Sequence, residues 1–187
     1  KELQQTNEQL AQKAQQLAEQ NAEVRQVLNS KEALDREDAD YFAINLPKHE
    51  HYRIALSFPL KTLFLDIETT GLSRHYDSIT LVGWSTGRDY NAYIKGDDPG
   101  PLRKALAEAK VIVTFNGSLF DVPFLRDEFP ELRIPAAHVD LRFLGKRVGL
   151  VGGQKDVESI VGLQRPGALS GLRGEAAPLL WHRYRRG

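Results

Sequence analysis

Leucine and valine recur every seven residues near the start of the chain, on a background of Gln, Glu and Ala without Gly or Pro. This pattern predicts a helix over residues 1–29. Its repeated positions are Leu3, Leu10, Leu17 and Val24, with Asn7, Ala14, Asn21 and Leu28 four residues after each. Such repeats form the seam of a coiled coil, in which Asn favours two strands. A helix that packs on its own domain has the same pattern, so self-association through residues 1–29 and intramolecular packing both stay open.

The next thirty residues have a weaker pattern. Asn29 and Ser30 can cap a second helix over residues 31–42. Residues 45–59 show no periodicity, and we expect them to be irregular. We therefore expect a helical, coiled-coil-like extension, a linker and a compact domain, over residues 1–42, 43–59 and 60–187.

Short apolar segments alternate with helical ones from residue 60 onward. Apolar or β-branched runs predict strands over residues 60–67, 78–85, 90–94, 111–115 and 138–141. Helical composition is found over residues 99–109, 119–129 and 175–186. A turn that contains Gly87 separates the second and third strands, as in a hairpin. A hairpin followed by strands that alternate with helices predicts an α/β fold with a mixed sheet.

The composition is that of a globular protein, with 41% hydrophobic and 27% charged residues. The 25 Lys and Arg residues balance the 25 Asp and Glu residues, which excludes a polycation and an acidic tail. Cysteine is absent, which excludes disulfides, thiol catalysis and zinc–thiolate sites. No apolar run reaches the ~18 residues of a membrane span, and residues 1–30 hold no secretory signal. We therefore expect a cytoplasmic protein with no membrane partner.

The charges are distributed unevenly along the chain. Residues 61–140 carry nine basic and 12 acidic side chains, whereas residues 141–187 carry nine basic and three acidic ones. An acidic middle followed by a basic end is expected of a metal-dependent enzyme that acts on a polyanion. Side chains of the basic end are candidates for phosphate contacts, although a solvated basic surface is the alternative: Lys146, Arg147, Lys155 and Arg165.

Two carboxylates lie where the first predicted strand ends, in the segment FLDIETTGL. Asp66 and Glu68 are two residues apart, so they project from the same face of a strand. Two such acids are costly beside a buried strand unless a cation compensates their repulsion, and oxygen ligands favour Mg²⁺ or Mn²⁺. Acids that simply face water are the alternative. The turn that follows is a candidate substrate-binding element, formed by Thr69, Thr70, Gly71 and Leu72.

A third acid follows the strand over residues 111–115, in the segment VIVTFNGSLFDVPFL. Asp121 lies in the first turn of a predicted helix, where the helix dipole stabilises negative charge. We expect it to be a third metal-facing carboxylate, with a capping acid as the alternative. Asn116 either orients the substrate or Asp121, or only completes the turn.

Four segments, DIETTGL, NGSLFDVPFL, HVDL and GGQKDVESIVGLQR, together resemble the DEDD (DnaQ-like) superfamily of ribonuclease H-like exonucleases. The resemblance is strongest to the YprB-like ribonuclease H-like domain and extends over about residues 60–184. It implies a mixed five-stranded sheet in the order 3-2-1-4-5, flanked by helices, with two metal ions bridged by carboxylates. It matches Asp66 and Glu68 to the first motif of the family and Asp121 to the second.

The resemblance implies a metal-dependent nuclease that binds DNA or RNA. It implies a 3′–5′ exonuclease that hydrolyses phosphodiester bonds with two Mg²⁺ or Mn²⁺ ions. Asp66, Glu68 and Asp121 would be the catalytic metal ligands, and Asn116 and Lys155 would contact the substrate. The fourth acid of the family would follow the stretch that resembles residues 179–184, so the chain looks truncated before the third motif. The alternative is a non-catalytic nucleic-acid-binding or scaffolding module that keeps the fold and lacks the fourth ligand.

Other polar motifs are expected to be structural. His49-Glu-His51 is spaced too tightly for a zinc-protease helix, and we expect both histidines at the surface. His138 and Asp140 belong to the last predicted strand, where we expect Asp140 to have a structural or supporting role.

Overall fold

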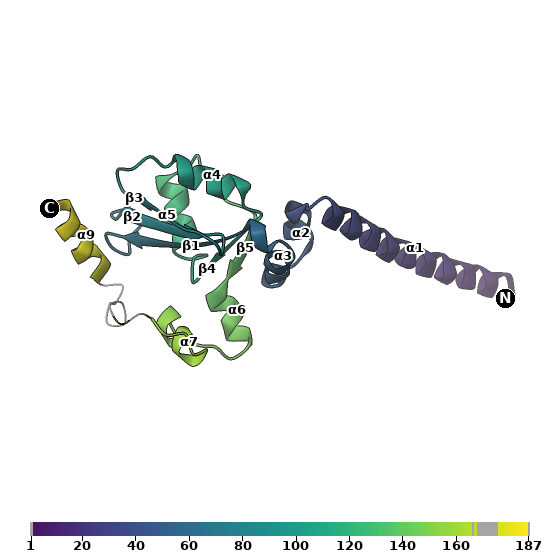
Figure 1. Cartoon of the computed structure of the whole chain (residues 1–187). Coiled ribbons are helices and arrows are strands. Elements are labelled where there is room, and N and C mark those ends of the chain that lie inside the picture. Colours follow the sequence, from purple (N-terminus) through teal and green to yellow (C-terminus); the bar gives the residue numbers. More distant parts are fainter. Residues whose placement is uncertain (1, 166, 168–175, 187) are drawn as a thin grey trace.

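The computed structural model describes residues 2–165, 167 and 176–186. Its centre is a five-stranded sheet in the order β3-β2-β1-β4-β5 (Figure 1). The strands are β1 (Thr62–Thr69), β2 (Ile79–Ser85), β3 (Tyr90–Ile94), β4 (Val111–Thr114) and β5 (Ala137–Asp140). β1 pairs antiparallel with β2 and parallel with β4, so the sheet is mixed. The expected strand order and sheet type are confirmed.

β4 is buried on both faces, as expected for a strand covered by helices on each side, whereas β1 is buried mainly on one face. All four residues of β4 are buried, and β1 alternates between core and non-core positions. β1 begins at Thr62 and not at residue 60, because Pro59–Lys61 forms a short 3-10 helix, η2. The proline at the start of η2 has no backbone N–H to donate to a strand ladder.

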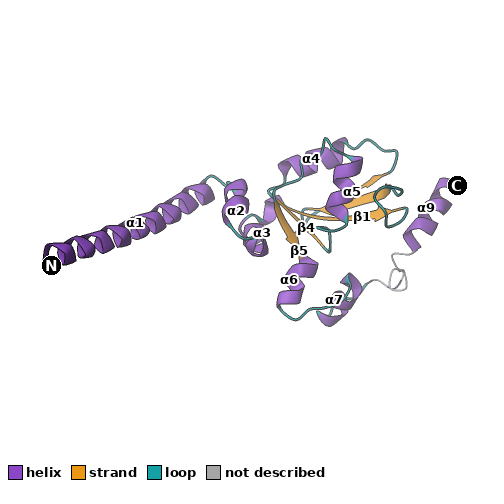
Figure 2. Cartoon of the chain, turned by 180° about the vertical axis from the view of Figure 1, so that it is seen from behind, coloured by secondary structure: helices purple, strands orange, loops and turns teal. Residues whose placement is uncertain are grey.

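Helices α4 (Gly100–Glu108) and α5 (Asp121–Glu128) pack on one face of the sheet, as Figures 1 and 2 show. The largest core cluster lies beneath them and combines Leu63, Leu65 and Ile67 of β1 with Leu102, Leu106, Phe124 and Leu125 of the helices. A second cluster lies where α2 (Ala39–Asn45) and α3 (Tyr52–Ser57) meet β4 and β5. It contains Ala39, Ile54, Phe58, Val111, Val113, Ala137 and Val139.

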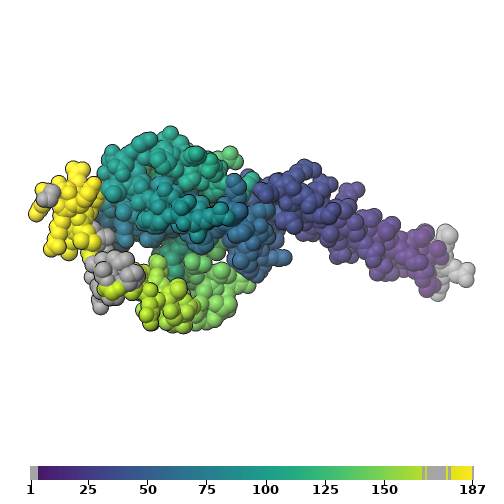
Figure 3. Space-filling model, in the orientation of Figure 1, coloured from purple at the N-terminus to yellow at the C-terminus, as the bar shows by residue number. Residues whose placement is uncertain are grey.

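The N-terminal segment forms one helix, α1 (Glu2–Asp35), which projects away from the sheet (Figures 1 and 3). The predicted break at Asn29 and Ser30 is wrong, because the Ser30 hydroxyl donates to the Gln26 carbonyl at 2.8 Å within the helix. The heptad side chains are exposed, with 60% of Leu10, 59% of Leu17 and 57% of Val24 accessible to solvent. Packing of these side chains on the chain's own domain is therefore absent from the described structure.

Residues 45–59 are not irregular, which corrects the expectation from their sequence. They contain the 3-10 helix η1 (Lys48–Glu50), then α3 and η2. His51 is only 3% exposed, so its expected surface position is wrong as well. These helices span three to six residues, too few for a periodic pattern to appear in the sequence. The division into domains at residues 42 and 59 remains a prediction.

After β5, the described part of the chain includes the helices α6 (Leu141–Arg147), α7 (Gln154–Ile160) and α9 (Ala176–Arg186). α6 and α7 were not expected from the pattern, and they lie on the opposite side of the sheet from α4 and α5 (Figures 1 and 2). None of the described helices combines the length and the apolar character that a membrane span requires.

Candidate active site

The acids of the first motif lie on β1, in the middle of the sheet. Leu65 and Ile67 point into the core, whereas Asp66 and Glu68 alternate with them and project from the opposite face. Asp66 lies opposite Gly83 of β2, which places it beside a strand position without a side chain. Both carboxylates therefore extend from a rigid central strand.

The acid of the second motif approaches β1 from the start of α5. Asp121 is the first residue of the helix and is 3% exposed. Its Oδ1 accepts a hydrogen bond of 3.1 Å from the backbone N–H of Ile67. Because Ile67 lies between Asp66 and Glu68, this bond places Asp121 beside the strand segment that carries the first two acids.

Burial disfavours the ionised form of each of the three carboxylates, and the charge of Asp66 adds to this effect at the other two. Burial raises the pKa of Asp121 to about 7, and the nearby charge of Asp66 adds to this rise. Burial also raises the pKa of Asp66, and burial together with the charge of Asp66 raises the pKa of Glu68. A cation placed among these groups would relieve the repulsion and the lost hydration.

Two cationic side chains from the basic end lie close enough to act on these acids. The charge of Arg165 partly opposes the rise in the pKa of Asp66, and the charge of Lys155 partly opposes the rise in the pKa of Glu68. Both pKa values stay raised. Arg165 is held by Glu158 of α7 through two hydrogen bonds of 2.7 and 2.9 Å. Arg147, a further phosphate candidate, lies elsewhere and donates to the His49 carbonyl at 3.3 Å.

The donor set suits a hard divalent cation, because it consists of carboxylate oxygens. Within the described part of the chain, however, no three His, Asp or Glu side chains converge closely enough to hold one ion. Asp66, Glu68 and Asp121 thus fit Mg²⁺ or Mn²⁺ by the chemistry of their oxygen donors. Because they do not converge on one point, their side chains would have to move toward the ion when it binds.

The turn after β1 is closed by a residue that the sequence analysis missed. The Asp77 carboxylate accepts from the Thr70 hydroxyl at 3.0 Å and from the Ser73 N–H at 2.9 Å. Gly71 lies against it, since a Cβ there would be 2.5 Å from Asp77 Oδ2. Leu72 is 87% exposed at the tip. The Thr69 hydroxyl donates to the Gly71 carbonyl, so both threonines stabilise the turn itself.

Asn116 completes the turn between β4 and α5. Its φ of 66° is left-handed, a conformation that Asn tolerates. Its N–H donates to Asp140 at 2.8 Å, and its Oδ1 accepts from Arg142 at 2.7 Å. Asp140 also accepts from the Ser118 and Arg142 N–H groups, which gives it the expected structural role. A substrate contact by Asn116 remains a prediction.

The sequence model of the RNase_H superfamily matches residues 63–187, a span that includes all three carboxylates. The chain belongs to the RNase_H superfamily. No curated protein sequence matches this RNase_H-superfamily chain. Its assignment to the DEDD group and to the YprB-like branch remains a prediction.

Several solved structures are similar to this RNase_H-superfamily domain at low sequence identity. A family B DNA polymerase from Pyrobaculum calidifontis has a TM-score of 0.52 and 19% identity, over 66% of this chain and 21% of the polymerase. NrnC from Brucella melitensis with bound Mg²⁺ has a TM-score of 0.48 and 21% identity, over 75% of each chain. The Aedes aegypti Nibbler EXO domain has a TM-score of 0.40 and 13% identity, over 54% of this chain and 52% of its own. The chain thus spans about a fifth of the polymerase and half of the Nibbler domain.

Proposed function

We propose that this protein is a metal-dependent nuclease, a 3′–5′ exonuclease that hydrolyses phosphodiester bonds of nucleic acid with two Mg²⁺ or Mn²⁺ ions. One observation carries the proposal: buried Asp121 is bonded to the Ile67 N–H between Asp66 and Glu68. Three acids with raised pKa values, two on a central strand and one at the start of α5, favour a cation site over a solvated strand end. Membership of the RNase_H superfamily supports this chemistry.

Asp66, Glu68 and Asp121 would hold the ions. Bound divalent cations lower the pKa of a water nucleophile and stabilise the leaving oxygen in phosphodiester hydrolysis. The protein's own residues fix the geometry, because two of the acids extend from a central strand and the third begins a packed helix. Lys155 and Arg165, which act on the same acids, would bind phosphates of the substrate. Thr69, Thr70, Gly71 and Leu72 would border the substrate at the end of β1.

A cleavage assay on the full chain tests the proposal. Single-stranded DNA and RNA oligonucleotides, labelled at the 5′ end, are incubated with Mg²⁺, with Mn²⁺ or with EDTA. We expect a ladder that shortens from the 3′ end and depends on the cation. Asp66→Asn and Asp121→Asn should each lower the rate by about 100-fold or more. Asp127→Asn, an exposed position on the same helix as Asp121, is the matched control and should leave the rate unchanged. Cleavage that persists in EDTA or in both site variants would refute the proposal.

A second candidate function is a non-catalytic nucleic-acid-binding or scaffolding module. The absence of three converging ligands from the described residues favours it. This function predicts that the wild-type chain retards the oligonucleotides in a gel shift without shortening them. It also predicts that Asp66→Asn leaves oligonucleotide binding in the gel shift unchanged, whereas Lys155→Gln weakens this binding.

We also propose that the chain self-associates through residues 1–29 as a two-stranded coiled coil. The exposed heptad positions Leu10, Leu17 and Val24 lie on a helix that stands clear of the domain (Figure 3). A row of apolar side chains at seven-residue spacing is stable in water when a second helix covers it. A second copy of the chain offers an identical row in register.

A further inference from the structure

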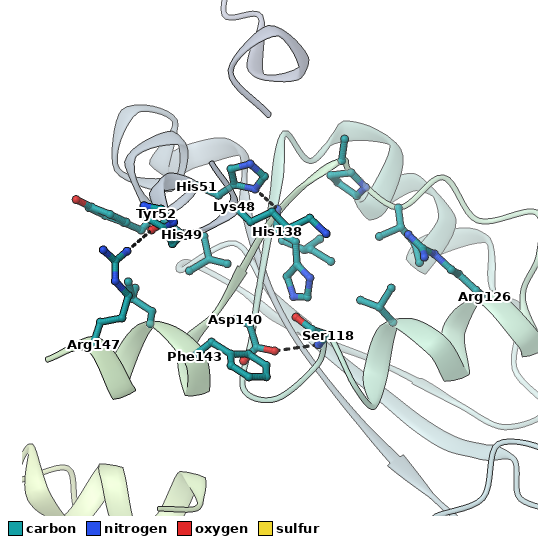
Figure 4. A pocket seen from close by; sticks show the side chains of 17 residues that line it. Lys48, His49, His51, Tyr52, Ser118, Arg126, His138, Asp140, Phe143 and Arg147 are labelled. Carbon is teal, nitrogen blue, oxygen red and sulfur yellow. Dashed lines mark hydrogen bonds between the residues drawn. The ribbon is translucent and has the colours of Figure 1, made fainter. Parts of the chain in front are cut away.

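A cavity of about 720 Å³ lies beside the edge strand β5, and none of the three candidate catalytic acids lines it (Figure 4). It is bounded by η1, by α5 and by α6. Its volume is in the range of small-molecule and cofactor sites. Its walls combine apolar side chains such as Val122, Pro135 and Leu144 with the aromatic rings of Tyr52 and Phe143.

The polar side chains of the cavity are mainly basic. Lys48, Arg126 and Arg147 line it, with Lys48 between the two arginines in Figure 4. Lys48 and Arg126 form no ion pair with any residue that the structure describes. One N–H group of Arg147 donates a hydrogen bond to the His49 carbonyl. The cavity therefore offers cationic donors that no carboxylate neutralises.

Asp140 is the one acid among the residues that line this cavity, and its oxygens are already occupied. Oδ1 accepts from the N–H groups of Asn116 at 2.8 Å and Arg142 at 3.1 Å, and Oδ2 accepts from Ser118 N–H at 3.0 Å. Asp140 thus belongs to the β4–α5 turn. It does not pair with the cations of the cavity.

His51 and His138 form the inner wall. His51 Nδ1 accepts the backbone N–H of His138 at 3.2 Å, which satisfies a donor on the open edge of β5. Because Nδ1 is the acceptor, the His51 ring carries its proton on Nε2, and this buried atom has no hydrogen-bond partner. Buried donors in folded proteins are almost always paired, so this unpaired group is an exception that lies inside the wall and not on the open surface of the cavity.

The cations act on the inner wall. Burial lowers the pKa of His138. The charge of Asp140 opposes this shift, whereas the charges of Arg126 and Lys48 lower the pKa further. His138 Nε2 also lies 2.8 Å from the Thr114 hydroxyl, which holds the ring in place. The cavity therefore places cationic side chains around a half-buried imidazole whose orientation is fixed.

We propose that this cavity binds a nucleoside phosphate, whose phosphate groups contact Lys48, Arg126 and Arg147 and whose base packs on the aromatic wall. Guanidinium groups bind phosphate oxygens through paired hydrogen bonds, and separated cations suit a ligand with more than one anionic group. The source of the ligand is either a free nucleotide or the end of a nucleic acid chain, since both present the same groups.

Calorimetry with adenosine diphosphate on the full chain tests this site. EDTA is present throughout, so the result does not depend on a cation at Asp66, Glu68 and Asp121. We expect saturable binding that weakens by about tenfold or more in Lys48→Gln/Arg126→Gln. Arg88→Gln, which removes an exposed charge in the β2–β3 turn, is the control and should bind as the wild type does. Absence of binding to the wild-type chain, or equal affinity in the double variant and wild type, would overturn the proposal.

A spectroscopic readout locates the ligand without a variant that threatens the fold. The ring ¹⁵N signals of His138, which lines the cavity, should shift on saturation with adenosine diphosphate, and signals that stay in place would contradict the site. A 5′-phosphorylated oligonucleotide distinguishes the two sources. Tighter binding than adenosine diphosphate, with the same loss in Lys48→Gln/Arg126→Gln, would assign the site to a nucleic acid end. Weaker binding would assign it to a free nucleotide.

Discussion

The carboxylate of Asp121 accepts a 3.1 Å hydrogen bond from the backbone N–H of Ile67, across 54 positions of the sequence. This bond joins the start of α5 to the central strand β1 between Asp66 and Glu68. Hydrogen bonding favours the charged form of Asp121, but burial and the charge of Asp66 outweigh it and raise the pKa to about 7. The site is thus held together by a group that resists ionisation.

The first prediction concerns pH and the stability of the metal-free protein. The pKa of Asp121 rises from 3.8 in the unfolded chain to about 7 in the folded protein. The folded state therefore holds a proton that the unfolded state has lost, and stability present below about pH 4 is lost as the pH rises through about 7. One pKa unit corresponds to about 1.4 kcal/mol, so the upper limit for this single group is about 4 kcal/mol.

Urea unfolding of wild type and Asp121→Asn in EDTA, at several pH values, measures this effect. The difference in unfolding free energy should move in favour of the variant as the pH rises from about 5 to about 8. Asp127→Asn, exposed on the same helix, controls for the substitution itself. A difference between Asp121→Asn and wild type that stays constant with pH would contradict the assigned pKa.

The second prediction concerns cation binding. Mn²⁺ should raise the melting temperature of the wild-type chain, because an ion that binds only the folded state stabilises it by about 2.7 kcal/mol at 100 times its Kd. Protons compete with the ion for Asp121, so the stabilisation should shrink as the pH falls below about 7. Scanning calorimetry of wild type, Asp66→Asn and Asp127→Asn measures it. Equal stabilisation of Asp66→Asn and wild type would exclude Asp66 as a ligand.

The third prediction concerns the turn that positions Asp121. The Gly117 carbonyl accepts from the Val122 N–H at 2.9 Å, and a Cβ at Gly117 would lie 2.5 Å from the Cβ of buried Thr114. Gly117→Ala should therefore destabilise the protein by about 1–3 kcal/mol, since the backbone must shift to relieve the overlap. Urea unfolding checks this, with Ser118→Ala at the adjacent exposed position as the control. A cost for Gly117→Ala no larger than that for Ser118→Ala would show that the close approach is unimportant.

The fourth prediction concerns the N-terminal helix. Leu10→Lys/Leu17→Lys should convert a dimer into a monomer, because charged side chains at both seam positions repel their counterparts. Analytical ultracentrifugation over a range of concentrations measures the mass. Gln5→Lys/Gln12→Lys adds the same charges off the predicted seam and should leave the dimer intact. A wild-type chain that sediments as a monomer at all concentrations would remove the coiled coil.

Segments with a regular pattern of apolar and polar residues are predictable from the sequence, because this pattern is a local signal. β3 was predicted over residues 90–94 and is observed at Tyr90–Ile94. Asp66 and Glu68 share a face because side chains alternate on any strand. Helices of three to seven residues, such as η1, α3, α6 and α7, were missed. Such short helices are unstable alone, so their stability comes from packing and leaves little trace in the sequence.

By itself, the sequence determined which segments form strands and which strand or helix carries each acid. The order of these segments, together with the family resemblance, implied the mixed sheet. Only the tertiary structure decided which distant groups meet. The bond from Ile67 to Asp121, the contact of His138 with buried His51 and the closure of a turn by Asp77 each depend on this packing. The reason is physical: periodicity reports which face of an element is buried, whereas the partner of a polar group is set by loop closure and by the packing of whole elements.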